Sequence, residues 1–258
     1  MRTTPPVPVI AALQLPPFDG HRERSIAWYE DFLLSNARVF SEGGIKAVKI
    51  QDETRERDRA APQTIARMSA LGRAFRKEFP AMQLGIIVQA HDGIAPLAIA
   101  DAADAHFVRL KIFVGAAINA EGTRNALSVE ATRYRRNIGR PDISIYADVH
   151  DRTCMPITPV ANETAALWAE SMGADGIVIT GSSFSDTIAR VAAARAAGVK
   201  CPILIGGGIN ADNVAAALKA ADAVVVSTSL LRDGAACDDF NLWDKDKILR
   251  LMDVAERR

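Results

Sequence analysis

The sequence predicts a single (β/α)8 TIM barrel that covers residues 1–258. Short apolar and β-branched runs alternate with helix-like segments from one end of the chain to the other, which is typical of βα units around a parallel sheet. Eight such runs in 258 residues match the usual size of this barrel, whereas a doubly wound sheet more often has about five to seven strands. No segment rich in proline, serine or glycine divides the chain.

The predicted strands are the runs in which valine, isoleucine and leucine concentrate. They lie at Val7–Leu13, Lys46–Gln51, Leu84–Gln89, Phe107–Ile112, Ser144–Val149, Gly176–Thr180, Pro202–Ile205 and Asp222–Val226. Apolar residues at helical spacing follow seven of these strands. They are Trp28, Phe32 and Val39; Ile65, Met68 and Phe75; Leu97, Ile99 and Ala102; Leu167, Ala169 and Met172; Ile188, Val191 and Ala194; Val214, Ala217 and Leu218; and Ile248, Leu251 and Met252.

Three glycines mark the ends of predicted helices. Gly44, Gly173 and Gly198 each stand between a helix and the next strand, where glycine commonly ends a helix in the left-handed conformation. They support the number of βα units.

Composition excludes several classes of protein. The chain has 31 Lys plus Arg and 31 Asp plus Glu, so no overall field attracts nucleic acid or an anionic membrane. Cys154, Cys201 and Cys237 lack a CxxC spacing, which favours a reducing compartment and argues against a zinc site. No run approaches the roughly 18 to 20 apolar residues of a membrane-spanning helix, and the N-terminal apolar run is too short for a signal peptide. We therefore expect a cytoplasmic protein without a nucleic-acid partner.

The clearest motif follows the last two predicted strands. Gly206-Gly207-Gly208 comes after the seventh strand, and Ser227-Thr228-Ser229 comes after the eighth. Glycines let the backbone approach an anion closely, and barrels of this class commonly hold phosphate between these two loops. The sequence therefore predicts a phosphate site at Gly207, Gly208, Thr228 and Ser229. The alternative is a simple tight turn, with Asn210 or Asp212 capping the next helix.

Candidate acid–base groups stand on the fifth predicted strand. A period of two places Tyr146, Asp148 and His150 on one face, and histidine exchanges a proton near neutral pH. We expect Asp148 and His150 to be catalytic. The alternative is that Asp148 makes a structural hydrogen bond and His150 is a solvated loop residue.

Two cations share a face of the fourth predicted strand. Val108, Leu110 and Ile112 suit the layer under the helices, which leaves Arg109 and Lys111 inside the barrel, where each must be paired. Asp148 and Asp52 are the expected partners. Lys111 is a candidate electrostatic clamp, base or Schiff-base lysine, and the alternative for both cations is an internal ion-pair network.

Further polar residues end the remaining strands. Those expected to bind a hydroxylated substrate are Gln14, Gln51, Asp52, Gln89, His91 and Thr180. Asp52 or Glu53 is also a candidate base, and the mixed-charge loop from Glu53 to Arg59 is a candidate lid. Asp52, Glu53, Asp148 and His150 offer ligand atoms for a divalent cation, but no ligand spacing links them, so we expect no required metal or other cofactor.

With these residues in place, nearly the whole chain resembles the BtpA/SgcQ family of ribulose-phosphate-binding-type barrels. The motifs that carry the resemblance are Leu15-Pro16-Pro17, Glu42-Gly43-Gly44, Phe107-Val108-Arg109, Gly115-Ala116, Arg133-Tyr134-Arg135-Arg136, Ala147-Asp148-Val149-His150, Ile179-Thr180-Gly181, Thr228-Ser229-Leu230 and Arg232-Asp233-Gly234. The resemblance implies the same barrel fold and one of two roles, sugar metabolism or biogenesis of photosystem I.

The sequence departs from the family pattern at the polar ends of several strands. Gln14 stands where members usually carry His, Gln51-Asp52 replaces Glu-Asn, Ala90-His91 replaces Arg-Asn, Lys111 replaces Asn, and Phe113-Val114 replaces His-Thr. The residues that keep the family's types are Asp148, His150, Arg109, Thr180, Thr228 and Ser229. The resemblance therefore implies a shared scaffold with a changed substrate or reaction.

The leading expectation is an enzyme, an isomerase, epimerase or aldolase-like lyase, acting on a small phosphorylated sugar or related polyol. Arg109 and Lys111 would stabilise enolate charge in it. One alternative is a non-catalytic assembly or stabilisation factor of the photosystem I biogenesis type, which would need an exposed partner surface outside the barrel mouth. Another is a regulator that binds a phosphorylated ligand without chemistry. Fold-level analogy adds the expectation of a homo-oligomer.

Overall fold

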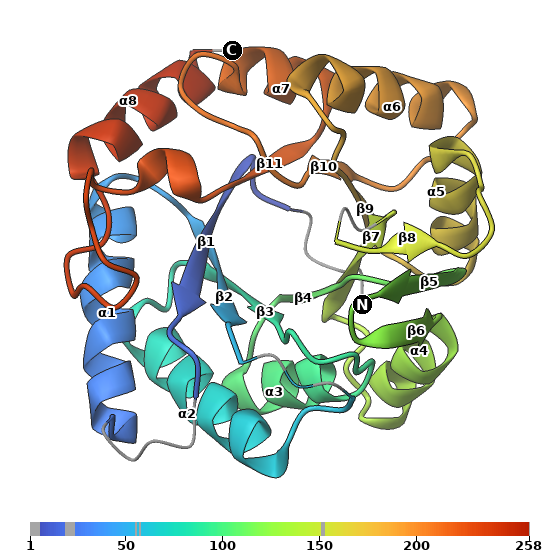
Figure 1. Cartoon of the computed structure of the whole chain (residues 1–258). Coiled ribbons are helices and arrows are strands. Elements are labelled where there is room, and N and C mark those ends of the chain that lie inside the picture. Colours follow the sequence, from blue (N-terminus) through green and yellow to red (C-terminus); the bar gives the residue numbers. More distant parts are fainter. Residues whose placement is uncertain (1–5, 19–23, 55, 57, 151–152, 258) are drawn as a thin grey trace.

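Eight parallel strands close into a barrel in the order β1-β11-β10-β9-β7-β4-β3-β2, with helices around it (Figure 1). The computed structural model describes residues 6–18, 24–54, 56, 58–150 and 153–257. The barrel strands are β1 (Val9–Leu15), β2 (Ala47–Asp52), β3 (Gln83–Ile87), β4 (Phe107–Leu110), β7 (Ser144–Val149), β9 (Gly176–Ile179), β10 (Ile203–Ile205) and β11 (Ala223–Val226). The predicted fold class is confirmed, and all eight predicted strands are present.

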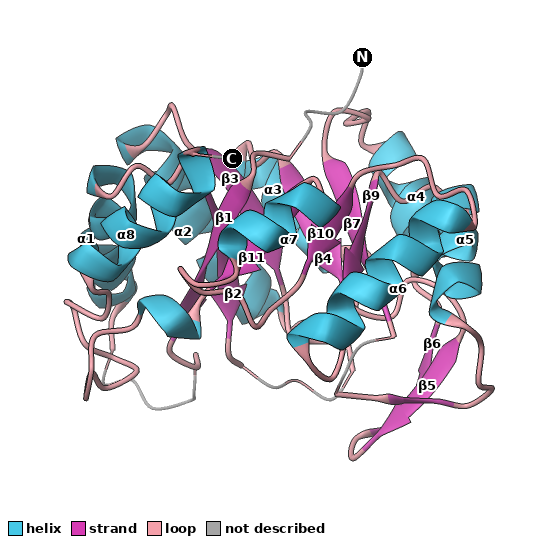
Figure 2. Ribbon diagram, turned by 90° about the horizontal axis from the view of Figure 1, so that it is seen from above, coloured by secondary structure: helices cyan, strands magenta, loops and turns pink. Residues whose placement is uncertain are grey.

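The helices lie outside the strands (Figure 2). They are α1 (Ile26–Glu42), α2 (Pro62–Glu78), α3 (Ala95–Ala103), α4 (Ser128–Asn137), α5 (Asn162–Ser171), α6 (Phe184–Ala196), α7 (Val214–Ala220) and α8 (Lys245–Glu256). Helix α4 has no counterpart among the predicted helices, because it buries only Ser128 and Ala131 and so lacks an apolar period. Within the described ranges, no helix combines the length and the apolar composition that crossing a membrane requires.

The predicted helix ends are confirmed at the three glycines. Gly44, Gly173 and Gly198 have φ angles of +87°, +95° and +101°, which fall in the region that only glycine enters without strain. Each lets the chain leave a helix and turn directly into the next barrel strand. These three glycines therefore help to set where helices end and the next barrel strands begin.

A three-stranded sheet that the sequence did not predict lies beside the barrel. It consists of β5 (Ala116–Asn119), β6 (Gly122–Asn125) and β8 (Met155–Pro156), in the order β6-β5-β8. Figure 2 shows β5 and β6 projecting beyond the helices, at the end of the barrel away from the N-terminus. The chain enters this sheet directly after β4 and returns to it after β7, so the sheet stands next to the carboxyl ends of those two strands.

The barrel interior is filled by apolar side chains at the amino-terminal ends of the strands. Phe107 and Tyr146 pack with their ring centroids 4.9 Å apart, and they belong to a cluster that is separate from the larger core under the helices. Gly85 on β3 leaves the room that the Phe107 ring occupies, because a Cβ atom there would lie 2.0 Å from the ring. The functional groups are therefore restricted to the other end of the barrel.

Replacing Gly85 with alanine is expected to destabilise the protein by about 1–3 kcal/mol, because the new methyl group overlaps the Phe107 ring. Phe107→Leu alone should also destabilise, because it leaves a cavity. The double variant should lose clearly less stability than the sum of the two, since the smaller side chain accommodates the methyl group. Denaturant unfolding of all four proteins measures this coupling, and additive costs would contradict the packing described here.

Candidate functional site

A cavity of about 430 Å³ occupies the mouth of the barrel at the carboxyl ends of the strands. Alternation along each strand places every second side chain on the barrel axis, so the mouth collects the last inward residues of all eight strands. Candidates that line it are Gln14, Gln51, Gln89, Arg109, Lys111, Asp148, His150, Thr180, Gly207, Gly208 and Thr228. The structure therefore brings most of the predicted site residues around one space.

The central ion pair of the mouth joins β4 to β7. Arg109 donates from Nε to Oδ1 of Asp148 at 2.8 Å and from Nη2 to Oδ2 at 3.2 Å, so the pair is bidentate. The side chain of Arg109 is 15% exposed and that of Asp148 is 8% exposed. Strands β4 and β7 are neighbours, and Arg109 is paired with Tyr146 across them. Asp148 therefore lies on β7 two residues beyond the position opposite Arg109. Of the two partners predicted for Arg109, the structure selects Asp148.

Two lysines add further positive charge to the mouth. Lys111 donates to Oε1 of Gln89, and Lys49 donates to Oε1 of Gln51 at 2.6 Å. Lys49 is buried, and burial together with the charge of Arg109 lowers its pKa well below that of free lysine. Alternation places Lys49 on the same strand face as Gln51, but nothing in the sequence assigned Lys49 to the site. It is the additional functional candidate that the structure supplies.

His150 follows the end of β7 and stands beside Asp148. Its φ angle of +53° is unusual for a residue other than glycine, and it turns the chain out of the strand. Burial and then the charge of Arg190 lower the pKa of His150, while a hydrogen bond with Asn162 opposes that shift. The lowered pKa favours the neutral imidazole, the form in which histidine accepts a proton.

The two loops expected to bind phosphate face the same cavity. Gly206, Gly207 and Gly208 line it from the β10 side, and Ser227 and Thr228 line it from the β11 side. A Cβ atom on Gly206 would lie 2.3 Å from Oγ1 of Thr180, so close packing requires glycine there. Gly208 has a φ angle of +74°, so it is needed for the backbone conformation.

The side chain of Ser229 does not line this cavity. It donates to the carbonyl oxygen of Ile209 at 2.7 Å and so ties the β11 loop to the β10 loop. The turn η1 (Thr228–Leu230) begins here, and the first amides of such a turn have no acceptor within it. Any contact of Ser229 with a ligand would therefore come from its backbone.

The helix cap predicted at Asn210 or Asp212 is wrong, because the N-cap residue of α7 is Asn213, without a side-chain cap hydrogen bond, and Asn210 instead closes the turn before the helix. Oδ1 of Asn210 accepts hydrogen bonds from the amides of Asp212 and Asn213 at 2.9 and 3.2 Å, and the side chain of Asn213 donates to the Gly208 carbonyl at 2.9 Å. The side chain of Asn213 thus supports the glycine loop, and Gly206, Gly207 and Gly208 line the cavity.

Two predicted substrate-binding residues lie outside the mouth cavity. Asp52, the last residue of β2, is fully buried, and its carboxylate accepts hydrogen bonds from the amides of Thr54 and Gln89 at 2.9 and 3.0 Å. Burial raises its pKa to about 7. His91 lines an adjoining cavity of about 270 Å³, and its Nε2 lies 2.8 Å from the carbonyl oxygen of Asn125. Asp52 therefore orders the loops around the mouth rather than facing a ligand.

The acidic and histidine side chains do not gather into a metal centre in the described part of the chain. No group of three or more His, Cys, Asp or Glu residues there is placed to hold an ion. The candidate cation ligands suggested by the sequence do not share one space. Asp148 and His150 line the mouth cavity, whereas Asp52 does not. The predicted lid from Glu53 to Arg59 includes positions 55 and 57, which lie outside the described residues.

The chain is similar to a recognised protein family over nearly its full length, and to known relatives over most of it. The model of the BtpA family matches residues 5–257. An uncharacterised protein of Archaeoglobus fulgidus is 27% identical over 96% of this chain and 98% of its own length. The photosystem I biogenesis protein BtpA of Synechocystis is 28% identical over 77% of this chain and 70% of its own.

Solved structures with the same fold are more distant in sequence. A native KDPGal structure has a TM-score of 0.59 at 15% identity, covering 100% of this chain and 98% of the other. N-(5'-phosphoribosyl)anthranilate isomerase from Pyrococcus furiosus has a TM-score of 0.54 at 13% identity, covering 98% and 100%. At these identities the likeness establishes the barrel fold.

Replacing Arg109 with methionine is expected to destabilise the protein by about 3–5 kcal/mol, because it removes the cation and the two hydrogen bonds that Arg109 gives the buried carboxylate of Asp148. Arg109→Met combined with Asp148→Leu should recover most of that loss, since no unpaired charge remains from the pair. Denaturant unfolding of the two single variants and the double variant measures the coupling. A double variant as unstable as the sum of the single variants would show that the pair is not energetically coupled.

Proposed function

The chain belongs to the BtpA family, and we propose that it is an enzyme acting on a small phosphorylated sugar or related polyol. Its reaction would be proton transfer, as in an isomerase or epimerase, or carbon–carbon cleavage, as in an aldolase. One observation carries the proposal. A single cavity of about 430 Å³ is lined by a glycine loop, Arg109, Lys111, the buried amine of Lys49, a carboxylate and a histidine whose pKa is lowered.

Phosphate would bind between the loops after β10 and β11. Backbone N–H groups of Gly207 and Gly208 would approach its oxygens from one side, and the amide and hydroxyl of Thr228 would do so from the other. The volume supports this proposal, because ligand cavities usually measure about 300–1,000 Å³.

The charge of the mouth favours an anionic substrate and an anionic intermediate. Lys49, Arg109 and Lys111 line the cavity with Asp148 as the only carboxylate among its described residues, although the chain as a whole has no net charge. Removing a proton from a carbon next to a carbonyl places negative charge on the carbonyl oxygen. Cations fixed around that oxygen stabilise the enediolate more than the starting ketone or aldehyde, which lowers the barrier.

His150 and Asp148 would move the protons. The neutral imidazole accepts the proton from carbon and, in an isomerase, returns it to the neighbouring carbon; in an epimerase a second acid would supply the proton to the opposite face of the same carbon. Asp148, held by Arg109, would pass the hydroxyl proton to the carbonyl oxygen. In the aldolase version, the same groups remove a hydroxyl proton while the carbon–carbon bond breaks, and the electron pair of that bond forms the enediolate. Neither version requires a cofactor.

Solved structures with the same fold support this class of reaction. Barrels with matching architecture include phosphoribosylanthranilate isomerases and a 4-hydroxy-2-oxoglutarate aldolase. Those activities belong to the named proteins. They support the proposal because the phosphate loops and acid–base groups of this chain suit the same chemistry.

A second candidate is an assembly factor, favoured by the Synechocystis relative and by exposed apolar residues outside the mouth. Ile118, Met155 and Ile157 are exposed on or beside the small sheet of β5 and β8. Binding of a phosphorylated ligand without any proton exchange or product would instead favour the third role considered, that of a regulator.

The variant Gly208→Val tests the phosphate site. Valine cannot adopt a φ angle of +74° without strain, so the loop should rearrange and the protein should lose its thermal stabilisation by sugar phosphates. Wild type with ligand at about 100 times its dissociation constant should gain about 2.7 kcal/mol, or several degrees in Tm. Gly198→Val is the matched control, because Gly198 has a φ angle of +101° at the other end of the barrel. A ligand-induced shift in Gly208→Val equal to that of wild type would refute the site.

Solvent exchange tests the chemistry without requiring net turnover. Phosphorylated aldoses and ketoses incubated in D2O with the wild type should lose a carbon-bound proton, seen by NMR, and Asp148→Asn and His150→Gln should each slow this at least about 100-fold while remaining folded. Because the pKa of His150 is lowered from 6.5, the wild-type rate should fall as the pH decreases with a midpoint below pH 6.5. Full exchange in Asp148→Asn would remove that residue from the mechanism.

A further inference from the structure

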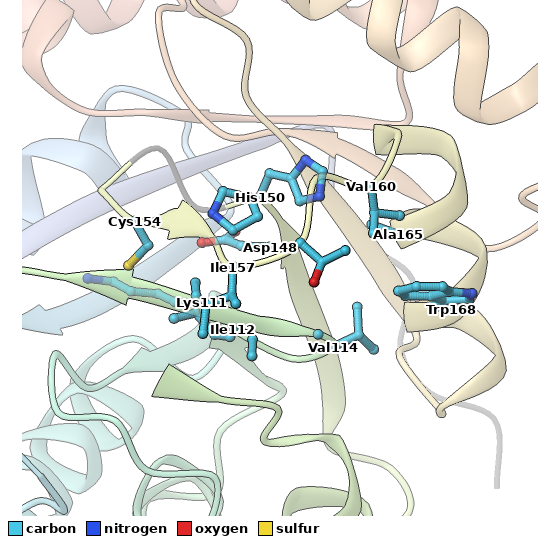
Figure 3. Close-up of a pocket in the computed structure, with 15 residues that line it drawn as sticks. Lys111, Ile112, Val114, Asp148, His150, Cys154, Ile157, Val160, Ala165 and Trp168 are labelled. Atoms are coloured by element: carbon cyan, nitrogen blue, oxygen red, sulfur yellow. The ribbon is translucent and has the colours of Figure 1, made fainter. Parts of the chain in front are cut away.

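A second cavity, of about 290 Å³, opens beside the barrel mouth, and we name it the annex (Figure 3). It shares Lys111, Asp148 and His150 with the mouth cavity. Its other walls come from the end of β4, from β5, from the segment that includes β8, and from α5. A molecule that extends from the mouth into the annex therefore passes directly over the proposed reactive groups.

Away from this shared edge the annex is mainly apolar, with Thr158 and Cys154 as the polar side chains of its lining. Its outer walls include Ile112, Val114, Ile157, Val160, Ala165 and Trp168. The peptide groups of the small sheet are largely used within it, since β5 and β8 pair with each other and the amide of Ile157 donates to the carbonyl of Ala116 at 3.0 Å. The walls thus offer shape and apolar contact and few hydrogen bonds, so a sugar hydroxyl placed here would lose its water without replacement.

Two of the walls keep large apolar side chains partly in contact with solvent. Ile157 is 53% exposed and Trp168 is 45% exposed. A ligand group seated in the annex would cover apolar surface on both, and this removal of area from water favours binding. The annex is large enough for this purpose, because a dry apolar cavity of about 150 Å³ already holds benzene.

The strand order sets the direction of such a ligand. In the ring of eight strands, β4 lies opposite β11, so the annex and the proposed phosphate loops are on opposite sides of the mouth. Asp148, His150 and Lys111 stand between them on the annex side. The three parts of the site are therefore arranged in sequence as phosphate loops, reactive groups and apolar annex.

We propose that the substrate carries, at the end remote from its phosphate, a flat apolar group of one or two fused rings that occupies the annex. This deepens and rests on the proposed function. A rigid ring fills the cavity with less loss of conformational freedom than a flexible alkyl chain of the same volume. The substrate class is thus an aryl- or heteroaryl-substituted sugar phosphate, and the β5–β8 sheet serves as a specificity element.

The test compares the affinities of ribose 5-phosphate, phenyl riboside and phenyl riboside 5-phosphate by calorimetry. Wild type should bind phenyl riboside 5-phosphate roughly tenfold or more tightly than ribose 5-phosphate, because ring burial removes ~100 Å² of apolar surface from water. Val114→Trp, which fills the annex, should remove this gain and leave the affinity for ribose 5-phosphate unchanged. Val129→Trp is the matched control, since Val129 is 60% exposed on α4 and outside the annex, and it should bind like wild type.

Trp168→Ala provides a second variant that needs no room inside the fold, and it should reduce the gain from the ring by removing one wall. Equal affinities of wild type for ribose 5-phosphate and its phenyl derivative would overturn the annex proposal and leave the proposed function standing. Failure of wild type to bind either phosphorylated compound would overturn the phosphate site and the annex proposal together. A gain that survives both Val114→Trp and Trp168→Ala would place the ring elsewhere and also overturn the annex proposal.

Discussion

Closing eight parallel strands into a ring leaves every second side chain of each strand on a narrow axis that only a few layers can fill. At the amino-terminal ends of the strands the rings of Phe107 and Tyr146 take that space, and Gly85 makes room for the Phe107 ring. At the carboxyl ends the same alternation places lysine, arginine, glutamine and aspartate around the mouth. Nearly everything proposed about function depends on this division of one axis into a packed half and a polar half.

Charges on a barrel axis persist only when each has a partner. Arg109 and Asp148 satisfy each other through two hydrogen bonds, and the glutamines beside the lysines accept hydrogen bonds without adding charge. The excess of cations over carboxylates therefore remains as a positive site at the mouth. An anionic substrate would complete the set, and this explains why a chain of zero net charge can still hold a strongly directed electrostatic site.

The small sheet of β5, β6 and β8 is an addition to the eight βα units of the barrel. It occupies the carboxyl ends of β4 and β7, the two strands that bear the central ion pair, and it converts their loops into an apolar chamber. Asp148 thus faces a polar mouth on one side and an apolar annex on the other. A residue in such a position contacts both halves of a ligand, and Lys111 and Val114 line the same chamber.

Periodicity in the sequence determined the barrel, its strands and which strand residues face inward. Arg109, Lys111 and Asp148 were assigned to the interior from alternation alone, and the glycines at helix ends were assigned from their positions between elements. Alternation could also have indicated Lys49, but a lysine in an apolar strand does not reveal whether its amine is buried. Asp52 shows the converse case, since its strand position did not disclose that it binds the amides of Thr54 and Gln89 instead of a ligand.

Tertiary structure alone decided which inward residues meet and what surrounds them. The choice of Asp148 as the partner of Arg109 depends on β4 lying beside β7, and the annex depends on strands that start about 40 residues apart, at Ala116 and Met155. A sequence pattern reports neighbours two, three or four positions away, because those spacings follow from the geometry of strands and helices. Contacts across a closed ring follow from the packing of the whole chain, so the inward faces could be read in the sequence and the cavity between them could not.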